Sequence, residues 1–284
     1  MTVKIQRMSE AIGAEIQGID LSRPLGDDNF AIISNAILEN AIVLFREQEI
    51  TIPQQLAFTK HFGDLEMHLV RSDAHPEFPE VYVLSNIVEK GKLKGTPPTR
   101  QSGAWHSDYA YKQIPASVSC FSAKTVPEQG GDTMFANMYA AYDALSEATR
   151  VRIGCLKWRT EPAKRMKLLF PDKSMSDEEI ASVPDFARPL VRTHPGSGRK
   201  ALFLGMSNPA SCEIVGLQQD EGCELLNEIR AFATEDRFVF SQQWQAGDVM
   251  LWDNRATIHR ATPWDYVNHQ RLAYRVVVKG DLPY

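Results

Sequence analysis

The chain has 284 residues, a formal net charge of −5 at pH 7 and no long basic run, which argues against nucleic acid as a partner. Residues 1–23 mix polar and apolar side chains, and no apolar run is long enough to span a bilayer, so we expect a cytoplasmic protein with no membrane partner. The four cysteines are scattered, which predicts reduced thiols and neither a disulfide framework nor a cysteine-based zinc site.

The sequence pattern over residues 3–61 predicts strands and helices. Apolar and polar residues alternate over 3–6 and 14–19, as in half-buried strands. Helical spacing over 28–40 predicts a helix with Asp27 or Asp28 as its N-cap, and the apolar run 41–45 predicts a buried strand. Thr51 is expected to cap a second helix that has Pro53 in its first turn and ends near His61.

The middle of the chain predicts a strand, a loop and a hairpin. Residues 81–87 are typical of a strand, whereas residues 88–104 are rich in Lys, Gly, Pro and Thr and predict a surface loop suited to a lid. Residues 116–126 predict a long strand. A turn at Gly130–Gly131 and a strand over 132–136 complete the expected hairpin.

The second half predicts mostly strands. Helices are expected at 138–145, 147–155 and 219–234. An insertion is expected at about 161–188, with some helix near 176–181. Residues 189–194 and 200–204 predict a hairpin, and strands are expected at 238–244, 248–252 and 271–278. This order favours a mainly β fold with flanking helices, built around a curved and mostly antiparallel β core.

The motif Trp105–Asp108 holds the residues most typical of a metal site. In extended backbone, His106 and Asp108 project to the same side, which brings an imidazole and a carboxylate together. His259 follows a predicted strand and the polar corner 253–255, and could supply a third ligand at the sheet rim. Two histidines and a carboxylate occur both in non-haem Fe(II) oxygenases and in hydrolytic zinc sites, so these ligands alone leave both chemistries open.

Two arginines on the last predicted strand suggest an acidic ligand. Arg271 and Arg275 fall on one face of this strand, with only Ala273 between them on that face. Because unpaired buried charge is costly, arginines inside the β core need an anionic partner. A dicarboxylate that chelates the metal at one end and meets an arginine at the other would supply it. The alternative is an internal salt bridge to Asp132 or Asp253.

Taken together, these motifs resemble the TauD/TfdA family, which includes taurine dioxygenase and 2,4-dichlorophenoxyacetate dioxygenase and uses Fe(II) and 2-oxoglutarate. The similarity runs from about Ile12 to Lys279. The segments that carry it, in chain order, are 42–46, 62–65, 105–108, 130–133, 140–145, 190–194, 252–255 with His259, and Arg271 with Arg275. Several motifs in the right order are far more specific than a single His-x-Asp.

The resemblance implies a role for each site residue. His106, Asp108 and His259 would bind iron, and Thr133 and Arg271 would bind the distal carboxylate of 2-oxoglutarate. Arg275 would lie near the acidic group of the substrate and the near carboxylate of 2-oxoglutarate. The implied fold is a double-stranded β-helix (jelly roll) that forms a single domain over residues 1–284, and family members are commonly homo-oligomers.

The implied reaction is the oxidative decarboxylation of 2-oxoglutarate by O₂ to succinate and CO₂, coupled to hydroxylation of a small organic acid such as a sulfonate, an aryloxy acid or another carboxylate. Hydroxylation beside a heteroatom would also cleave the substrate. His68 aligns with a histidine that taurine-cleaving enzymes use on the sulfonate, but Arg71 and Ser102 replace a Tyr and an Asn of those enzymes, and the C-terminal third is closer to the phenoxyacetate type. The candidate substrate contacts are His68, Arg71, Arg100, Ser102, Tyr109 and Arg275. A zinc hydrolase and a non-catalytic jelly-roll binding protein remain alternatives.

Overall fold

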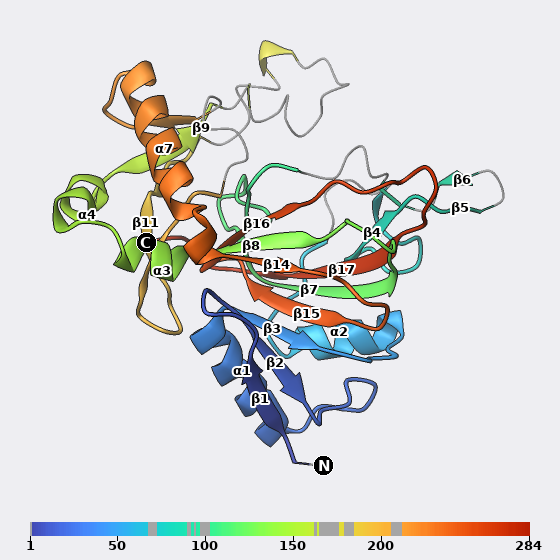
Figure 1. Cartoon of the computed structure of the whole chain (residues 1–284). Helices are drawn as coiled ribbons and strands as arrows, with labels where there is room; N and C mark the ends of the chain where they lie inside the picture. The colour runs from blue at the N-terminus through green and yellow to red at the C-terminus, as the bar shows by residue number, and fades with distance from the viewer. Residues whose placement is uncertain are drawn as a thin grey trace.

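Two antiparallel sheets face each other in the computed structural model, which describes residues 2–67, 73–89, 92–93, 95–96, 103–161, 164, 176–178, 185–205 and 212–284 (Figure 1). The larger sheet contains, in spatial order, β1 (Lys4–Arg7), β2 (Ala14–Gln17), β3 (Ile42–Phe45), β15 (Val249–Asp253), β7 (Ala116–Thr125), β17 (Leu272–Lys279) and β4 (Val81–Ser85). The smaller sheet contains β14 (Val239–Gln242), β8 (Thr133–Asn137) and β16 (Thr257–Ala261). Among the strand pairs of the described residues, β2 with β3 is the one parallel pair, so the predicted mostly antiparallel β core is confirmed.

The strand β7, which lies between β15 and β17 in the larger sheet, buries side chains on both of its faces. Phe121 and Ala123 project toward the smaller sheet and join the core that includes Phe135 of β8. Val118 and Cys120 project to the opposite face, which α1 (Asp27–Asn40) and α2 (Ile52–Lys60) cover. A strand with apolar neighbours on both faces is rigid, and it therefore offers a stable platform for polar side chains placed along it.

The two N-terminal helices show how local sequence sets the element boundaries. At α2 the Thr51 side chain accepts a hydrogen bond from the Gln54 backbone N–H, and the Gln54 side-chain oxygen accepts one from the Thr51 backbone N–H, so the predicted cap is present as a full capping box. The helix predicted over 28–40 is present as α1, but its predicted N-cap was wrong. Its N-cap is Gly26, and Asp27 and Asp28 lie in the first turn, where they meet the positive end of the helix dipole.

The predicted hairpin between residues 116–126 and 132–136 does not form. β7 pairs with β15 and β17 in the larger sheet, whereas β8 pairs with β14 and β16 in the smaller one. Gly130 and Gly131 both have positive φ, and a Cβ at Gly130 would lie 2.5 Å from the Pro263 carbonyl oxygen. This turn therefore carries the chain from one sheet to the other.

The remaining elements gather mainly at one end of the sheets (Figure 1). They are α3 (Met138–Asp143), α4 (Glu147–Ile153), β9 (Lys157–Thr160), β10 (Arg188–Pro189), β11 (Val191–Thr193), β12 (Lys200–Leu202), β13 (Cys212–Ile214), α7 (Gln219–Ala233) and the 3-10 turn η4 (Asp236–Phe238). The predicted hairpin is present as β11 and β12, whereas β9 and β13 were not predicted. No helix in the described ranges is long and apolar enough to cross a membrane.

Two predicted irregular regions are described only in part. Within 88–104, β5 (Val88–Glu89) pairs with β6 (Lys92–Leu93), so a short hairpin interrupts the expected loop. Residues 97–102 lie outside the described residues, as does most of the predicted insertion at 161–188. Of the helix expected near 176–181, residues 177 and 178 are described and are helical, and the lid role of 88–104 stays a prediction.

Candidate metal centre

The metal centre begins with a backbone pairing between two histidines. The His106 N–H donates to the His259 carbonyl oxygen at 2.9 Å, and the His259 N–H donates to the His106 carbonyl oxygen at 2.7 Å. His259 follows the corner 253–255 as predicted, and it lies inside β16, the edge strand of the smaller sheet, opposite Phe135 of β8. This pairing brings together two imidazole rings 153 positions apart in the sequence, with ring centroids 4.3 Å apart.

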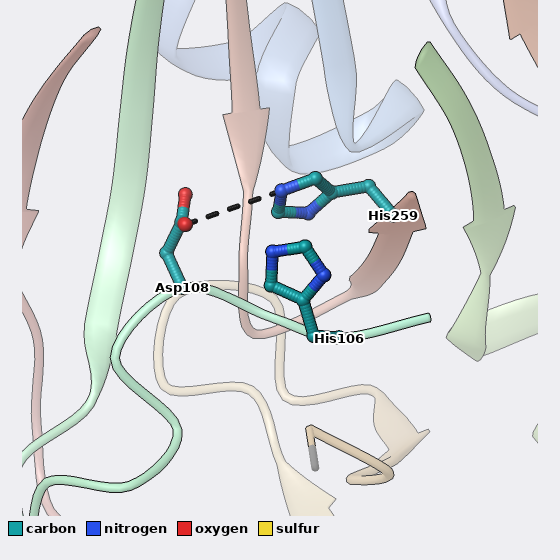
Figure 2. A group of neighbouring side chains, drawn as sticks. All are labelled: His106, Asp108 and His259. Carbon is teal, nitrogen blue, oxygen red and sulfur yellow. Dashed lines mark ion pairs between the residues drawn. The ribbon is translucent and has the colours of Figure 1, made fainter. Parts of the chain in front are cut away.

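Asp108 reaches the same place from a turn. Only His106 takes part in the β-bridge, and Tyr109 adopts a left-handed conformation with φ 52°. Contrary to the prediction, the motif is therefore not extended as far as Asp108, but the His106 imidazole and the Asp108 carboxylate still converge (Figure 2). A positive φ on a bulky residue is strained and is tolerated where the surroundings enforce it, and Tyr109 is buried.

The three side chains fit a metal ion. One ligand atom each from His106, Asp108 and His259 lies within 4.8 Å of the other two. The His106 Nδ1 is 2.9 Å from the Ala104 carbonyl oxygen, which only accepts hydrogen bonds, so Nδ1 carries the hydrogen and Nε2 keeps its lone pair. The His259 Nε2 lies 4.0 Å from Asp108 Oδ1.

Burial sets the charge of these ligands. It lowers the pKa of His106, and it lowers the pKa of His259 to about 3 with a further contribution from His106, so both imidazoles are neutral at neutral pH. For Asp108, burial acts to raise the pKa, but Arg275 and the two histidines outweigh it and the pKa falls to about 2. A neutral, neutral and anionic donor set is the protonation state that metal binding requires.

Two polar neighbours hold Asp108. Ser119 Oγ donates to Asp108 Oδ2 at 2.6 Å, and Arg275 Nη1 donates to Oδ1 at 2.6 Å. The Asn254 side-chain oxygen accepts from the Asp108 backbone N–H at 3.0 Å. Ser119 was not singled out from the sequence, and Asn254 appeared only as part of a family motif, because neither residue type marks such a role by itself.

The two predicted arginines lie on the inner face of the larger sheet. Arg275 pairs in register with Phe121 of β7, and its guanidinium lies 4.8 Å from the centre of the Tyr82 ring. Its Nε is buried and has no hydrogen-bond acceptor among the described residues. Burial acts to lower the pKa of Arg275, but the Asp108 carboxylate reverses this and leaves it raised, so the side chain is cationic.

Arg271 is the more deeply placed cation. It is 3% exposed, and its guanidinium lies 5.9 Å from the centre of the Phe121 ring. Burial lowers its pKa to about 10 although Asp132 acts in the opposite direction, so it is charged at neutral pH. Asp253, the other acidic partner considered, is bound by Arg255 and His194. Thr133 is buried, and its hydroxyl accepts from Trp244 Nε1 at 3.0 Å.

Most of the predicted substrate contacts cannot be located. His68, Arg71, Arg100 and Ser102 lie outside the described residues, so they remain predictions. Tyr109 is described, and its ring meets that of Tyr111 edge to face at 5.7 Å. Aromatic side chains thus flank the Arg275 end of the site. Tyr109 was among the predicted substrate contacts, whereas Tyr82 and Tyr111 were not.

Comparison with known proteins gives a consistent result. Residues 4–277 match the family model described as "Taurine catabolism dioxygenase TauD, TfdA family". An alpha-ketoglutarate-dependent 2,4-dichlorophenoxyacetate dioxygenase of Cupriavidus pinatubonensis is 34% identical, over 96% of each chain. An (S)-phenoxypropionate/alpha-ketoglutarate-dioxygenase of Sphingobium herbicidovorans is 32% identical, over 98% of this chain and 95% of the relative. Alpha-ketoglutarate is another name for 2-oxoglutarate.

A solved structure agrees in fold. The crystal structure of AAD-2 in complex with Mn(II) and N-oxalylglycine has a TM-score of 0.80 and 30% sequence identity, and the match covers 100% of this chain and 99% of that one. Because the family model spans nearly the whole chain, and relatives above 30% identity match it from end to end, the chain belongs to the TauD, TfdA family of 2-oxoglutarate-dependent dioxygenases.

Proposed function

We propose that this protein is an Fe(II)- and 2-oxoglutarate-dependent dioxygenase that hydroxylates a small aryl or aryloxy acid and releases succinate and CO₂. The observation that carries the proposal is the position of Arg275: this cation donates a hydrogen bond to the Asp108 carboxylate and lies among aromatic rings. Fe(II) with bound 2-oxoglutarate supplies the activation of O₂. The residues of the chain bind, orient and desolvate the reactants.

His106, Asp108 and His259 are the proposed iron ligands. One carboxylate and two neutral imidazoles on one side of an ion leave its other positions for the cosubstrate and O₂, as in the facial triads of non-haem iron enzymes. The same set also suits zinc, but the two arginines favour an oxygenase. A cosubstrate with two carboxylates accounts both for Arg275, which contacts Asp108, and for Arg271, which is buried just before β17.

Arg271 and Thr133 are the proposed contacts of the distal carboxylate of 2-oxoglutarate. Arg271 holds a full charge in a buried position, where a guanidinium–carboxylate pair is stronger than in water. The Thr133 hydroxyl already accepts from Trp244, so its own hydrogen can be donated to a carboxylate.

Arg275 is the proposed anchor of the substrate's acidic group. One of its nitrogens donates to Asp108, while Nε is buried without an acceptor in the described residues, so this guanidinium retains a donor for an anion. Tyr82, Tyr109 and Tyr111 add aromatic surface near it, which suits a ring attached to the acid. Both relatives compared above are named for phenoxy acids.

Several broader features belong to the same proposal. We infer that the two facing sheets form the double-stranded β-helix of the family, that residues 1–284 are one catalytic domain, and that the protein is a cytoplasmic homo-oligomer. The support is the antiparallel pairing of both sheets and the match over almost the whole chain. Light scattering of the purified protein measures its oligomeric state.

The decisive experiment is a succinate-release screen with phenoxyacetates, phenoxypropionates, alkyl sulfonates and neutral aryl ethers. We expect turnover of the aryloxy acids, with His106→Ala and Asp108→Ala inactive. His61→Ala, a change of an exposed histidine at the end of α2, serves as the matched control with wild-type activity. Equal turnover of acids and neutral ethers would contradict the role of Arg275, and activity in the His106 variant would contradict the metal assignment.

Zinc hydrolysis and simple binding are tested in the same preparation. Anaerobic addition of Fe(II) and 2-oxoglutarate should give a weak visible charge-transfer band, which zinc cannot produce. Absence of that band, together with absence of succinate for every compound, would refute the oxygenase.

A further inference from the structure

Asp108 is held in place by contacts outside the sheet hydrogen-bond pattern. It lies in the turn after the His106 bridge. Its carbonyl oxygen accepts from the Ala116 N–H of β7 at 3.4 Å, but its own N–H has no backbone acceptor in the described residues. Instead, its N–H donates to the side-chain oxygen of Asn254, 146 positions away, and its carboxylate accepts from Ser119. Asn254 Nδ2 also donates to Ser119 Oγ at 2.9 Å, so the Asn254 amide contacts the Asp108 backbone directly and the Asp108 carboxylate through Ser119.

The orientation of the Asn254 amide is determined by its neighbours. Its oxygen lies within hydrogen-bond distance of two N–H donors, the Asp108 backbone and Trp252 Nε1 at 3.1 Å. Two donors require an acceptor, so the oxygen faces them and the NH₂ group faces Ser119. All four residues of this group are buried, which makes each of these hydrogen bonds costly to lose.

This orientation sets the direction of the next hydrogen bond. Because Asn254 Nδ2 can only donate, Ser119 Oγ must accept from it, and the Ser119 hydroxyl hydrogen is left to point at Asp108 Oδ2. That oxygen is thereby occupied. The other oxygen, Oδ1, lies toward His259 and accepts from Arg275, which leaves one of its two lone pairs for an ion.

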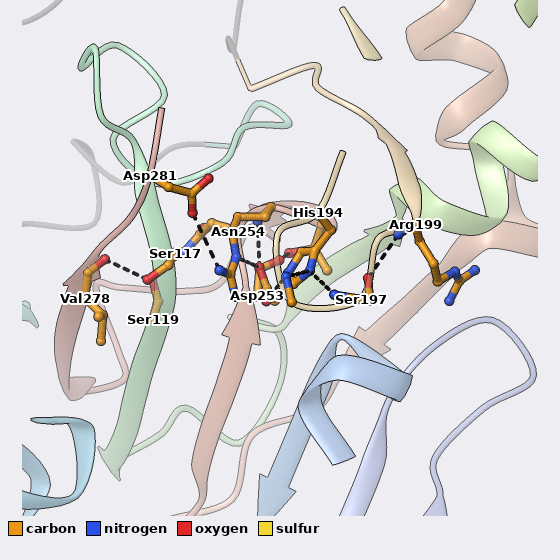
Figure 3. A network of polar contacts seen from close by, with 12 residues as sticks. Ser117, Ser119, His194, Ser197, Arg199, Asp253, Asn254, Val278 and Asp281 are labelled. Atoms are coloured by element: carbon orange, nitrogen blue, oxygen red, sulfur yellow. Dashed lines mark hydrogen bonds and ion pairs between the residues drawn. The ribbon is translucent and has the colours of Figure 1, made fainter. Parts of the chain in front are cut away.

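The corner that carries Asn254 is itself firmly anchored (Figure 3). Both oxygens of Asp253 accept hydrogen bonds from Arg255, and Oδ2 also accepts from His194 Nε2 at 2.9 Å. His194 Nδ1 accepts from two backbone N–H groups, so Nε2 carries the hydrogen. The Asn254 backbone N–H donates to the Ser117 carbonyl oxygen at 2.8 Å, which ties the corner to β7.

We infer that Asn254 and Ser119 are positioning residues of the metal centre: they fix the backbone and one carboxylate oxygen of Asp108 and so present Oδ1 to the ion. This role rests on the proposed metal site. Outer contacts of metal ligands orient the donor atoms, and their loss commonly weakens metal affinity by about 10–100-fold.

The test measures Mn(II) affinity of the protein without cosubstrate by isothermal titration calorimetry, beside the melting temperature of the metal-free protein. Ser119→Ala and Asn254→Ala are expected to raise the Mn(II) Kd about 10–100-fold. The matched control is Ser122→Ala on the same strand. Its hydroxyl is also buried, but it has no hydrogen-bond partner among the described residues, so the Kd should not change.

The double variant distinguishes a relay from two separate effects. Because Asn254 acts on the carboxylate through Ser119, we expect the combined change in Mn(II) binding free energy to be smaller than the sum of the single changes. Additive changes would overturn the relay, and so would a Kd for Ser119→Ala within twofold of wild type. If Asn254→Ala does not fold, Ser119→Ala against Ser122→Ala decides the question alone.

Failure of this inference is distinct from failure of the proposed function. A wild-type protein that binds no Mn(II) and releases no succinate overturns both. An active wild type with an unchanged Ser119→Ala affinity overturns the positioning role only.

Discussion

Replacing Arg271 with Met should have opposite effects on folding and on cosubstrate binding. The side chain is 3% exposed, and burial lowers its pKa to about 10, so the surroundings disfavour its charge even with Asp132 nearby. Methionine fills much of the same space without a charge. We therefore expect the melting temperature of the cosubstrate-free protein to stay the same or rise, because relief of the desolvation penalty offsets lost contacts.

Cosubstrate binding should weaken strongly in the same variant. Truncation of one partner of a buried charge pair costs about 2–5 kcal/mol, which corresponds to roughly 30- to 4,000-fold in affinity. Titration of the Mn(II)-loaded protein with N-oxalylglycine measures this directly. Arg260→Met is the matched control, since this arginine packs on the Trp105 ring and against Met134 and is only partly buried.

The reasoning fails if Arg271→Met binds N-oxalylglycine within twofold of wild type. It also fails if the melting temperature falls sharply while affinity is kept, because Arg271 would then be a structural cation.

Two further perturbations test other parts of the site. Gly205→Ala should destabilise the protein by about 1–3 kcal/mol and weaken Mn(II) binding, because a Cβ there would lie 2.5 Å from Ala110 Cβ and 2.6 Å from Ser107 Oγ, beside the metal ligands. Gly103→Ala, where nothing lies within 4 Å, is the control, and equal urea midpoints for the two variants would contradict this packing argument. Burial acts to raise the pKa of Asp253, but Arg255 and His194 outweigh it and leave the pKa below its usual value. The ionised Asp253 carboxylate therefore stabilises the fold fully above about pH 5, and this stabilisation declines as the pH falls through the ordinary pKa of an aspartate and below. Asp253→Asn should therefore be less stable than wild type at pH 7, with a difference in free energy of unfolding that narrows toward pH 3; a constant difference would refute the assignment.

Local sequence was sufficient where a local interaction decides the structure. The Thr51 cap of α2 depends on Gln54, three residues away, and the prediction there was correct. The cap of α1 was predicted wrongly, because two neighbouring aspartates and a glycine offer three similar solutions within one turn.

The pairing between distant strands could not be predicted from local sequence patterns. The sequence around Gly130 and Gly131 is equally consistent with a hairpin and with a crossing between sheets, since a glycine turn permits either. The choice depends on which neighbours bury β7 and β8, and those neighbours, β15, β17, β14 and β16, all come from the last third of the chain.

The candidate metal ligands and the two arginines could be identified from residue type and order, because imidazole, carboxylate and guanidinium carry chemistry that other residue types lack. Their contacts became clear from the folded chain: His106 pairs with His259 through the backbone, Arg275 contacts Asp108, and Asn254 and Ser119 hold this residue. The bonds from Asp108 to Arg275 and Asn254 span 167 and 146 positions. Serine and asparagine acquire such a role solely from the neighbours that the fold gives them, so no local signal announces it.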